Sequence, residues 1–600
     1  MPGDRPQVSW RRSAVVLTRL AARVDRPRTV GALAVLSAQA VVQSLFALWL
    51  KLFLDGVGDR HTGTIVLAAT GTAASIAGTA ALSYAGSRLL STLDNRMQYF
   101  VNRRILELVG SVPTLELHET PEHLNQIEAL RDGQYMLYSV VPRLVSILTT
   151  LVRLIVTAIL LAGVNPLLLV LPLFGLPAVA VSPWTGGLFR VGMERAAEPA
   201  RRAAHLLELT ATAGAAKEVR LFRLAGELHD RFTAEQRLIR RIHFRLQIRA
   251  AALGIGTRIV FLVGYFAAIV YVVHLAVEGR ASIGDAVLTA VLAGQVLGLV
   301  TGSAELLQLA FQSLVAAGRF VYLEDLVAAH RPVAASDQAP TTLSRGIRLE
   351  GVSYAYPGVN REAVHDLDLQ LPAGSTVAIV GDNGAGKSTL VKLLAGMYRP
   401  TGGRILFDDT DIAGVDVDDL RRQVSACFQD HARFEFILRE TVGIGDLPIL
   451  ADGVRCDPAV LEALGRAGAA DLPAGLDTPL SPNRPKGTDL SGGQWQKVSL
   501  GRSMMRTRPL LLLLDEPAAA LDADTEDALF RRWAEAARRL RSTNGGITVL
   551  VSHRFSTVRM ADLVVVLDNG RVVETGTHEE LLARDGHYAQ MYGLQARSYR

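Results

Sequence analysis

The sequence predicts a multidomain membrane protein, in which a six-helix all-α transmembrane domain precedes an α/β nucleotide-binding domain of the P-loop type. Long apolar runs lie almost entirely before residue 320, whereas the charges and turn residues of a soluble α/β protein dominate after it. A glycine-rich turn between an apolar strand and a helix, at 381–388, has the form of a phosphate-binding loop. The 600 residues, 49% of them hydrophobic with a mean hydropathy of +0.25, exceed what one soluble core needs.

Six apolar runs in the first half are long enough to cross a membrane, since a helix needs about 20 apolar residues to do so. Short connections join the runs on one side, whereas long polar stretches at 91–139 and 184–250 separate them on the other. The predicted spans lie near residues 30–54, 64–90, 140–164, 165–183, 251–276 and 284–318.

Arginine accumulates on the side of the long polar stretches, as at Arg103 and Arg104, and also before the first run. By the positive-inside rule, both termini and both long stretches lie in the cytoplasm, which predicts a multi-pass protein of the cytoplasmic (inner) membrane. The formal net charge of +5 is therefore expected to meet anionic membrane lipids. No nucleic-acid motif accompanies this charge, so no nucleic-acid partner is predicted.

The chain divides into four predicted segments. Residues 1–29 form a basic, amphipathic elbow along the inner membrane surface, with a solvated basic tail as the alternative. Residues 30–320 form the transmembrane domain with six helices and two long cytoplasmic loops, residues 321–345 a linker, and residues 346–600 the nucleotide-binding domain. The two cysteines have no metal-ligand spacing and are predicted to be structural.

The phosphate-binding loop is predicted from its flanking elements. An apolar run at 375–380 reads as a strand, and 389–395 continues with helical spacing. A glycine-rich turn between them brings backbone N–H groups and a helix N-terminus close to phosphates. Lys387 is expected to reach the β- and γ-phosphates, and Ser388 to hold Mg²⁺. The residues predicted to contact the nucleotide here are Gly381, Asp382, Asn383, Gly384, Ala385, Gly386, Lys387, Ser388 and Thr389.

Two further strands are predicted to deliver polar groups to the same sheet edge. Four leucines at 511–514 precede Asp515 and Glu516, as in a buried parallel strand with acids at its carboxyl end. Asp515 can hold Mg²⁺, and Glu516 can polarise the attacking water. A run at 547–551 leads to His553, which would lie near the γ-phosphate.

A third motif, Leu490-Ser491-Gly492-Gly493-Gln494, precedes a helix and the acid-bearing strand. A bare Ser-Gly-Gly is commonly a flexible surface loop. The order of all these motifs, however, resembles that of the ATP-binding-cassette (ABC) transporters. The second half resembles their nucleotide-binding domain (ABC ATPase), and the whole chain resembles a half-size exporter of this family.

The resemblance implies roles for several residues. Tyr356 would stack on adenine, with Tyr354 as the less favoured choice, and Gln429 would touch Mg²⁺ and water. His553 would sense the γ-phosphate, and Asp522 would cross to the opposite site. The signature, Leu490 to Gln494, would close over a nucleotide held by a second chain. Coupling helices are expected at 217–222 and around 119–125, although ordinary charged helical surface is the alternative for both.

The expected function is therefore ATP-driven efflux by alternating access, with ATP and Mg²⁺ as cofactors and Glu516, His553, Lys387 and Gln429 as catalytic residues. The resemblance implies a second half-transporter, an identical chain in a homodimer, because every site motif has the competent form. The cargo would be an amphipathic drug or antibiotic, a lipid or a peptide. An ATP-gated channel or a non-transporting regulator is the alternative, whereas the six predicted spans contradict a soluble ATPase.

Polar residues within the spans predict a substrate cavity. Arg153 lies mid-span in a run otherwise free of charge, and an intramembrane charge usually faces the bundle interior or is paired. Arg153 is expected either to favour anionic or amphipathic cargo or to form a structural ion pair, with Glu305 as a candidate partner. In the last span a polar stripe at helical spacing shares one face and is expected to turn toward a central cavity: Thr301, Glu305, Gln308 and Gln312. As the alternative, Glu305 reaches lipid headgroups or a neighbouring arginine from the inner end of the span.

Overall fold

The computed structural model describes residues 11–13, 15–17, 19, 25–330, 337–359, 361–517, 523–552, 554 and 558–598. Within these ranges, side chains are not described at 132, 190, 194, 213, 301, 303–305, 307, 308, 311, 523–530 and 595–598. The chain forms two compact units. Unit 1 comprises residues 1–109 and 126–325, and unit 2 comprises residues 110–125 and 326–600.

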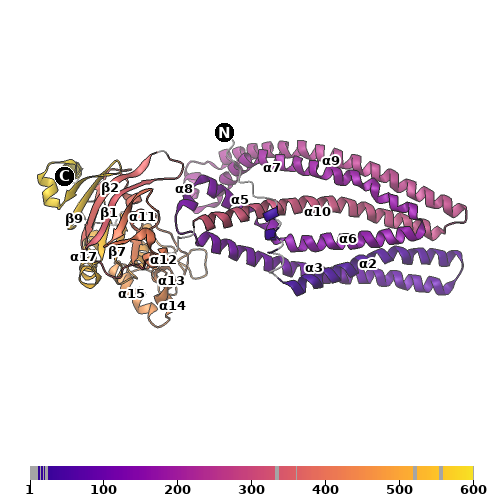
Figure 1. The fold of residues 1–600 in the computed structure, drawn as a ribbon, viewed down its shortest axis with the longest axis horizontal. Coiled ribbons are helices and arrows are strands. Elements are labelled where there is room, and N and C mark those ends of the chain that lie inside the picture. The colour runs from indigo at the N-terminus through magenta and orange to yellow at the C-terminus, as the bar shows by residue number, and fades with distance from the viewer. Residues whose placement is uncertain are drawn as a thin grey trace. The chain divides into compact units, whose positions relative to one another are not determined.

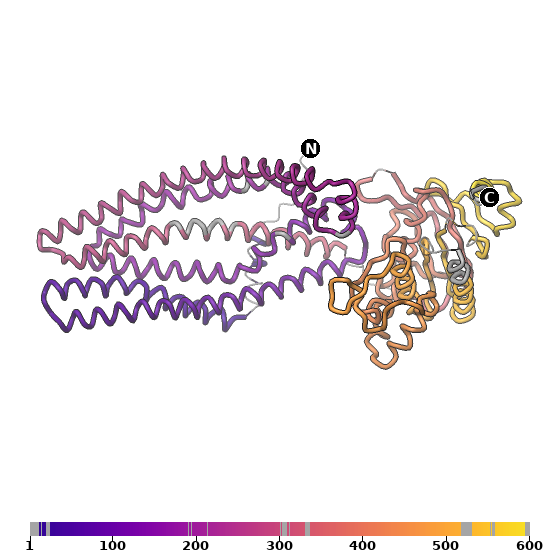
Figure 2. Tube along the Cα trace, turned by 180° about the vertical axis from the view of Figure 1, so that it is seen from behind, coloured from indigo at the N-terminus to yellow at the C-terminus, as the bar shows by residue number. Residues whose placement is uncertain are grey.

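Unit 1 is a bundle of long helices that run side by side (Figure 1, Figure 2). In the described part of the chain, six helical segments are long and apolar enough to cross a membrane, as the sequence predicts. The elements are α2 (Arg26–Gly58), α3 (Thr62–Gly110), α5 (Pro121–Tyr138), α6 (Val140–Val164), η1 (Pro166–Gly175), α7 (Leu176–Ala211), α8 (Ala213–Leu221), α9 (Ala225–Val277) and α10 (Ile283–Ala329).

Local chemistry fixes several helix ends. The Asp25 side chain accepts a hydrogen bond from the Arg28 N–H, which caps the start of α2, and Asp25 also pairs with Arg96 of α3 at 2.5 Å. At the other end of α2, the Lys51 ammonium lies 2.5 Å from Asp285 of α10, and Asp55 accepts from the Gly284 N–H at 3.1 Å. The contacts of Lys51 and Asp55 join the C-terminal end of α2, the first span, to the N-terminal end of α10, the last span.

Several helices are much longer than a membrane span. At 1.5 Å per residue the 53 residues of α9 extend about 80 Å, whereas the hydrocarbon core is about 30 Å thick. The fourth span begins as the 3₁₀ segment η1, which contains Pro172, and continues into α7. An apolar core formed by α6, η1, α9 and α10 includes Leu161, Leu171, Phe261 and Leu292.

Unit 2 contains two sheets. The antiparallel sheet has the order β2-β1-β4-β5, formed by β1 (Gly346–Ala355), β2 (Glu362–Pro372), β4 (Gly402–Phe407) and β5 (Thr410–Asp411). The larger sheet has the order β10-β9-β3-β8-β7-β6, and all its neighbours are parallel except β10 and β9. Its strands are β3 (Thr376–Gly381), β6 (Val424–Cys427), β7 (Leu511–Asp515), β8 (Ile547–Val551), β9 (Leu563–Asp568) and β10 (Arg571–Gly576).

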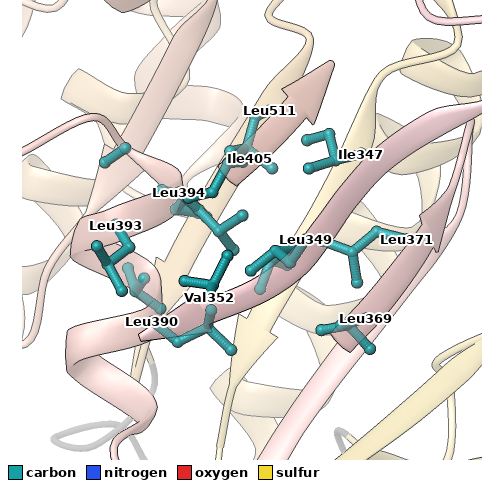
Figure 3. Packing of buried hydrophobic residues seen from close by; sticks show 14 of the residues in the cluster. Ile347, Leu349, Val352, Leu369, Leu371, Leu390, Leu393, Leu394, Ile405 and Leu511 are labelled. Carbon is teal, nitrogen blue, oxygen red and sulfur yellow. The ribbon is translucent and has the colours of Figure 1, made fainter. Parts of the chain in front are cut away.

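The core of unit 2 lies between the two sheets. Helix α11 (Lys387–Leu394) inserts Leu390, Leu393 and Leu394 between β1 and β7, as Figure 3 shows. Every residue of β7 and β8 is buried, which explains why both strands appear in the sequence as continuous apolar runs. Strand β3 ends at Gly381 and α11 begins at Lys387, so the packing of both elements in this core fixes the two ends of the loop between them.

The remaining helices of unit 2 surround the sheets. The helices α13, α15 and α16 share a second apolar core with β7. Their bounds are α4 (Glu116–Glu119), η2 (Ile412–Gly414), α12 (Val417–Arg422), α13 (Leu438–Gly443), α14 (Leu447–Ala451), α15 (Cys456–Arg466), α16 (Gly492–Ser503), α17 (Ala523–Asn544), α19 (His578–Ala583) and α20 (His587–Ser598).

Candidate nucleotide site

A cavity of about 760 Å³ opens at the carboxyl edge of the parallel sheet in unit 2. Strands β3, β7 and β8 all end there, which is where parallel sheets place ligands. Its lining includes most of the residues that the sequence predicts. They are Tyr356, Ala363, Val380, Gly381, Asp382, Asn383, Gly384, Gly386, Lys387, Ser388, Thr389, Gln429, Asp515, Glu516, Val551, Ser552, Val558 and Met591.

The loop between β3 and α11 depends on glycine at its last turn. Gly386 has φ +101°, a left-handed backbone, and a Cβ there would lie 2.6 Å from the Ala363 carbonyl oxygen. Gly386 also precedes the first turn of α11, so the helix N-terminus faces the loop. Ala385, by contrast, is buried in the apolar core and does not line the cavity. The loop backbone thus leaves room for a phosphate chain beside a helix N-terminus.

Lys387 and Ser388 begin α11 at the centre of the cavity. The Lys387 ammonium donates to the carbonyl oxygens of Gly381 and Asp382, at 2.7 and 2.8 Å. Burial lowers the pKa of Lys387, and the negative charge of Glu516 acts in the opposite direction. A half-buried ammonium that is held by loop carbonyls can turn to an incoming phosphate without rebuilding the loop.

The two acids at the end of β7 lie in different environments. Burial raises the pKa of Asp515 from 3.8 to about 6, the charge of Glu516 adds to this, and a hydrogen bond with Ser388 opposes it. Glu516 has φ +47°, a conformation that is strained for a residue with a side chain. Bonds hold this strained peptide, because the Glu516 N–H donates to the Val551 carbonyl and its carbonyl accepts from Gln496.

This arrangement fits a divalent cation. A buried carboxylate, a serine hydroxyl bonded to it and a glutamine side chain all reach the same cavity at Asp515, Ser388 and Gln429. Hard cations such as Mg²⁺ prefer oxygen ligands of these kinds and bind alongside phosphates. Burial, and then the charge of Glu516, raise the pKa of Asp515, and a bound cation would compensate both effects.

Of the two tyrosines considered for the adenine, Tyr356 lines the cavity and Tyr354 does not. The Tyr356 hydroxyl lies 2.9 Å from the Thr389 hydroxyl of α11. Tyr354 is 1% exposed within β1. The strand alternation could not separate the two, because residues two apart lie on the same face.

The motif at 490–494 lies outside the lining of this cavity. It forms the start of α16: Ser491 accepts from the Gln494 N–H, and the Gln494 side chain accepts from the Ser491 N–H at 2.8 Å. This capping box explains a serine and a glutamine three residues apart. Ser491 and Gly492 remain exposed, so the start of α16 is accessible to a second molecule.

Several predicted residues cannot be placed. Asp522 and His553 lie outside the described residues, although Val551 and Ser552 directly before His553 line the cavity. In unit 1 the side chains of Thr301, Gln308 and Glu305, the candidate partner of Arg153, are likewise outside the described part.

Arg153 lies near the middle of α6, and its buried Nε has no hydrogen-bond partner among the described residues. Gln312 of α10 is partly buried. It lies 29 residues after the start of α10, or about 44 Å along the helix at 1.5 Å per residue.

Sequence reasoning missed two contributions. Met591 of α20 lines the cavity, although it lies 40 residues after the last predicted strand and carries no motif. Arg143 at the start of α6 is buried, and it donates to the Leu309 carbonyl and the Ser313 hydroxyl of α10. Neither residue has a local signal, because both depend on packing between distant segments.

Comparisons with known proteins agree with this geometry. Residues 30–300 match the model of the ABC transporter transmembrane region, and residues 364–519 match that of the ABC transporter. Together the two models match well over half of the chain, and the transmembrane match precedes the nucleotide-binding match, as unit 1 largely precedes unit 2. The chain belongs to the ABC transporter family.

Individual relatives of this ABC transporter are similar over part of their length. An ATP-dependent lipid A-core flippase of Chromohalobacter salexigens is 37% identical over 256 residues, 43% of this chain and 42% of the flippase. The flippase of Ralstonia nicotianae is 39% identical over 254 residues, 42% of this chain and 40% of that protein. The ABC-type transporter fsqE of Aspergillus fumigatus is 38% identical over 255 residues, 42% of this chain and 19% of fsqE. The matches to both flippases span about two fifths of their length.

A solved structure extends the likeness to the whole fold. The structure of a bacterial Atm1-family ABC exporter with ATP bound covers 95% of this chain and 98% of its own, with a TM-score of 0.76 and 24% identity. The fold of this chain is therefore that of an ABC exporter, with six membrane helices followed by the α/β nucleotide-binding unit.

Proposed function

We propose that this chain is one half of an ATP-driven exporter of the cytoplasmic membrane, with both termini in the cytoplasm, and that it pairs with an identical chain. The observation that carries the proposal is the single cavity in which a phosphate-binding loop, Lys387 and the acid pair Asp515 and Glu516 meet. Six apolar helices on the same chain supply the membrane part. The named activities of the relatives, an ATP-dependent flippase and a transporter, support this combination.

In this proposal each group of cavity residues has its own role in binding or hydrolysing ATP. The loop N–H groups and Lys387 bind the phosphates, Tyr356 stacks on adenine, and Glu516 accepts a proton from the attacking water. Ser388, Gln429 and Asp515 would hold Mg²⁺, which neutralises charge on the phosphates when it is bound. His553 completes the γ-phosphate contacts in this proposal. The strained backbone of Glu516, bonded on both sides, keeps its carboxylate in place beside the cavity.

A second chain completes the site. The capped start of α16 is exposed and does not line the cavity of its own chain. In the proposed dimer, Ser491 and Gly493 donate to the γ-phosphate bound by the partner chain, and Asp522 crosses to the opposite site. Because each nucleotide is then held between two lobes, ATP binding favours closure and hydrolysis removes it.

Two cytoplasmic segments connect this closure to the membrane helices. Helix α4 ends at Glu119, where the first predicted coupling region begins, and it belongs to unit 2. The Leu115 N–H before it donates to the Met397 carbonyl at 3.2 Å. The second predicted region, α8, belongs to unit 1 and leaves Leu221 and Phe222 exposed at 75% and 63%. We propose that α8 docks on the nucleotide-binding unit of the partner, which covers these apolar side chains.

The cargo is proposed only as a class, an amphipathic drug, lipid or peptide. Relatives with similar identity include lipid A-core flippases and a fungal transporter, so the shared sequence does not select one cargo. Within unit 1, Arg153 carries a buried Nε without a hydrogen-bond partner in the described part of the chain. A guanidinium at mid-span that is not fully hydrogen-bonded within the described part of the chain favours an anionic group on the cargo.

The proposal is tested with reconstituted protein. ATPase activity is measured across a panel of amphipathic antibiotics, lipids and peptides, and stimulating compounds are then followed in sealed inverted vesicles. Uptake against a gradient that requires ATP hydrolysis supports export. Passive flux that needs only bound ATP would replace the proposal with a gated channel, and ATP turnover without any flux would replace it with a regulator.

A further inference from the structure

Three tyrosines pack ring against ring beside the nucleotide cavity. The Tyr354 and Tyr398 rings are stacked, with centroids 4.7 Å apart. Tyr356 meets both edge-on, at 5.2 Å from Tyr354 and 5.7 Å from Tyr398. Only Tyr356 lines the cavity, and Tyr398 is 2% exposed. A change in the Tyr356 ring position must therefore be accommodated by two buried rings that are in contact with it.

The far side of this tyrosine cluster is bonded to α4. The Tyr398 hydroxyl donates to the Glu119 carboxylate at the end of α4. Glu119 also lies 3.4 Å from the Lys392 ammonium of α11, and that ammonium lies 5.6 Å from the centre of the Tyr398 ring. Burial and the bond to Glu119 both raise the pKa of Tyr398, so the hydroxyl stays a donor at any physiological pH.

Other bonds place α4 against the same turn. The Leu115 N–H donates to the carbonyl of Met397, the residue before Tyr398, and the Leu115 side chain packs on the apolar core of unit 2. The Arg421 guanidinium donates to the Pro113 carbonyl. The segment at 113–119 thus contacts the nucleotide-binding unit at the turn that carries Met397 and Tyr398, at Lys392 of α11 and at Arg421 of α12.

We propose that Tyr398 is a positioning residue that couples adenine on Tyr356 to the docking of α4. The inference rests on the proposed function, in which Tyr356 is the adenine platform. Stacking of adenine fixes the Tyr356 ring, the edge-on contact then restricts the Tyr398 ring, and the hydroxyl of Tyr398 holds Glu119. The base thereby acts on α4 through its own contact with Tyr356, separately from the phosphates that the loop binds.

The cluster contains its own control residue. Tyr354 is stacked on Tyr398 and is equally buried, but its hydroxyl has no hydrogen-bond partner among the described residues. Tyr354→Phe and Tyr398→Phe therefore remove the same atom from neighbouring rings, and only Tyr398→Phe removes a bond to α4.

The test is hydrogen exchange of the amides from Leu115 to Thr120 in the full chain in lipid nanodiscs, without ligand, with Mg·ATP and with Mg·tripolyphosphate. Tripolyphosphate fills the phosphate loop but has no base. We expect ATP to slow exchange by about fivefold or more, the lower end of ordinary coupling factors, in the wild type and in Tyr354→Phe. Tripolyphosphate has no such effect, and Tyr398→Phe and Glu119→Ala lose the effect of ATP.

Coupling is reciprocal, so Tyr398→Phe also weakens ATP binding by the same factor and leaves tripolyphosphate binding unchanged. A merely structural role would change both ligands alike. The inference is overturned if Tyr398→Phe keeps the full ATP effect, or if tripolyphosphate protects α4 as well as ATP does. Displacement of a fluorescent ATP analogue distinguishes failure of the proposed function from failure of the coupling. A wild type that does not bind ATP refutes the proposed function. ATP binding without slower exchange in α4 refutes only the coupling.

Discussion

Replacement of Asp515 by asparagine is expected to stabilise the nucleotide-free protein while it abolishes the response to Mg·ATP. Asp515 is 5% exposed at the end of β7, and burial together with the charge of Glu516 raises its pKa from 3.8 to about 6. Asparagine has nearly the same shape and can still bond to Ser388. It carries no charge, so it avoids the cost of a buried carboxylate but cannot replace it as a cation ligand.

The expected size follows from the pKa. A change from 3.8 to about 6 is about two pKa units, and at 1.36 kcal/mol each the ionised carboxylate costs the folded unit up to about 3 kcal/mol. Because the folded-state pKa is the higher one, the folded protein binds more protons between these pH values. The wild type therefore loses stability as pH rises from about 4 to 6, and the full cost is present above pH 6.

The assay is thermal unfolding of the full chain in nanodiscs with a metal chelator, followed for the nucleotide-binding unit. At pH 7.5 we expect the midpoint of Asp515→Asn to lie about 5 to 10 °C above that of the wild type, since about 1 kcal/mol shifts a unit of this size by 2 to 4 °C. The difference is about halved at pH 5. Glu516→Gln, which removes only the neighbouring charge, gives a smaller rise.

Mg·ATP provides the second half of the assay. At about 100 times its dissociation constant it stabilises the wild type by about 2.7 kcal/mol, and this gain is lost in Asp515→Asn. The reasoning is refuted if the nucleotide-free variant is less stable than the wild type at pH 7.5, or if it keeps the full stabilisation by Mg·ATP.

Three further predictions concern the loop, the membrane cavity and the docking helix. Gly386→Ala is expected to abolish binding of a fluorescent ATP analogue, because its Cβ would lie 2.6 Å from the Ala363 carbonyl at φ +101°, and micromolar binding would contradict this. Arg153→Ala is expected to keep basal ATPase activity but to lose transport of anionic cargo by about tenfold, because the positive charge at mid-span is removed. Undiminished transport of every cargo would exclude the role. Phe222→Asp is expected to retain ATP binding and to lose cargo stimulation of ATPase, because a charge replaces an apolar side chain that is 63% exposed; normal stimulation would show that α8 docks by other residues.

The elements that the sequence predicts correctly are those with a strong local pattern. The six spans follow from apolar length, and the buried strands β7 and β8 follow from uninterrupted apolar runs. The strand, glycine turn and helix at 376–394 follow from the short glycine-rich motif between an apolar run and a segment with helical spacing.

The features that the sequence does not reveal depend on contacts between distant segments. The resemblance implies a coupling helix around 119–125, but the sequence does not reveal its contacts, such as the bond of Leu115 to Met397, more than 280 residues away. Met591 reaches the cavity from the last described helix, and Arg143 bonds to a helix that begins 140 residues later. Hydrophobic periodicity carries no information about such pairings, because it records only which face of an element is buried.

The central claim, that ATP holds two copies of the nucleotide-binding unit together, is tested most directly with Glu516→Gln in the full chain. This substitution keeps the side-chain shape but removes the proposed base, which is expected to lower turnover by about 10² to 10⁴-fold. After incubation with Mg·ATP and removal of free nucleotide, the account predicts one trapped ATP per chain and a shortened distance between spin labels on the two nucleotide-binding units. Lobes that stay apart, with no ATP retained between them, would contradict it.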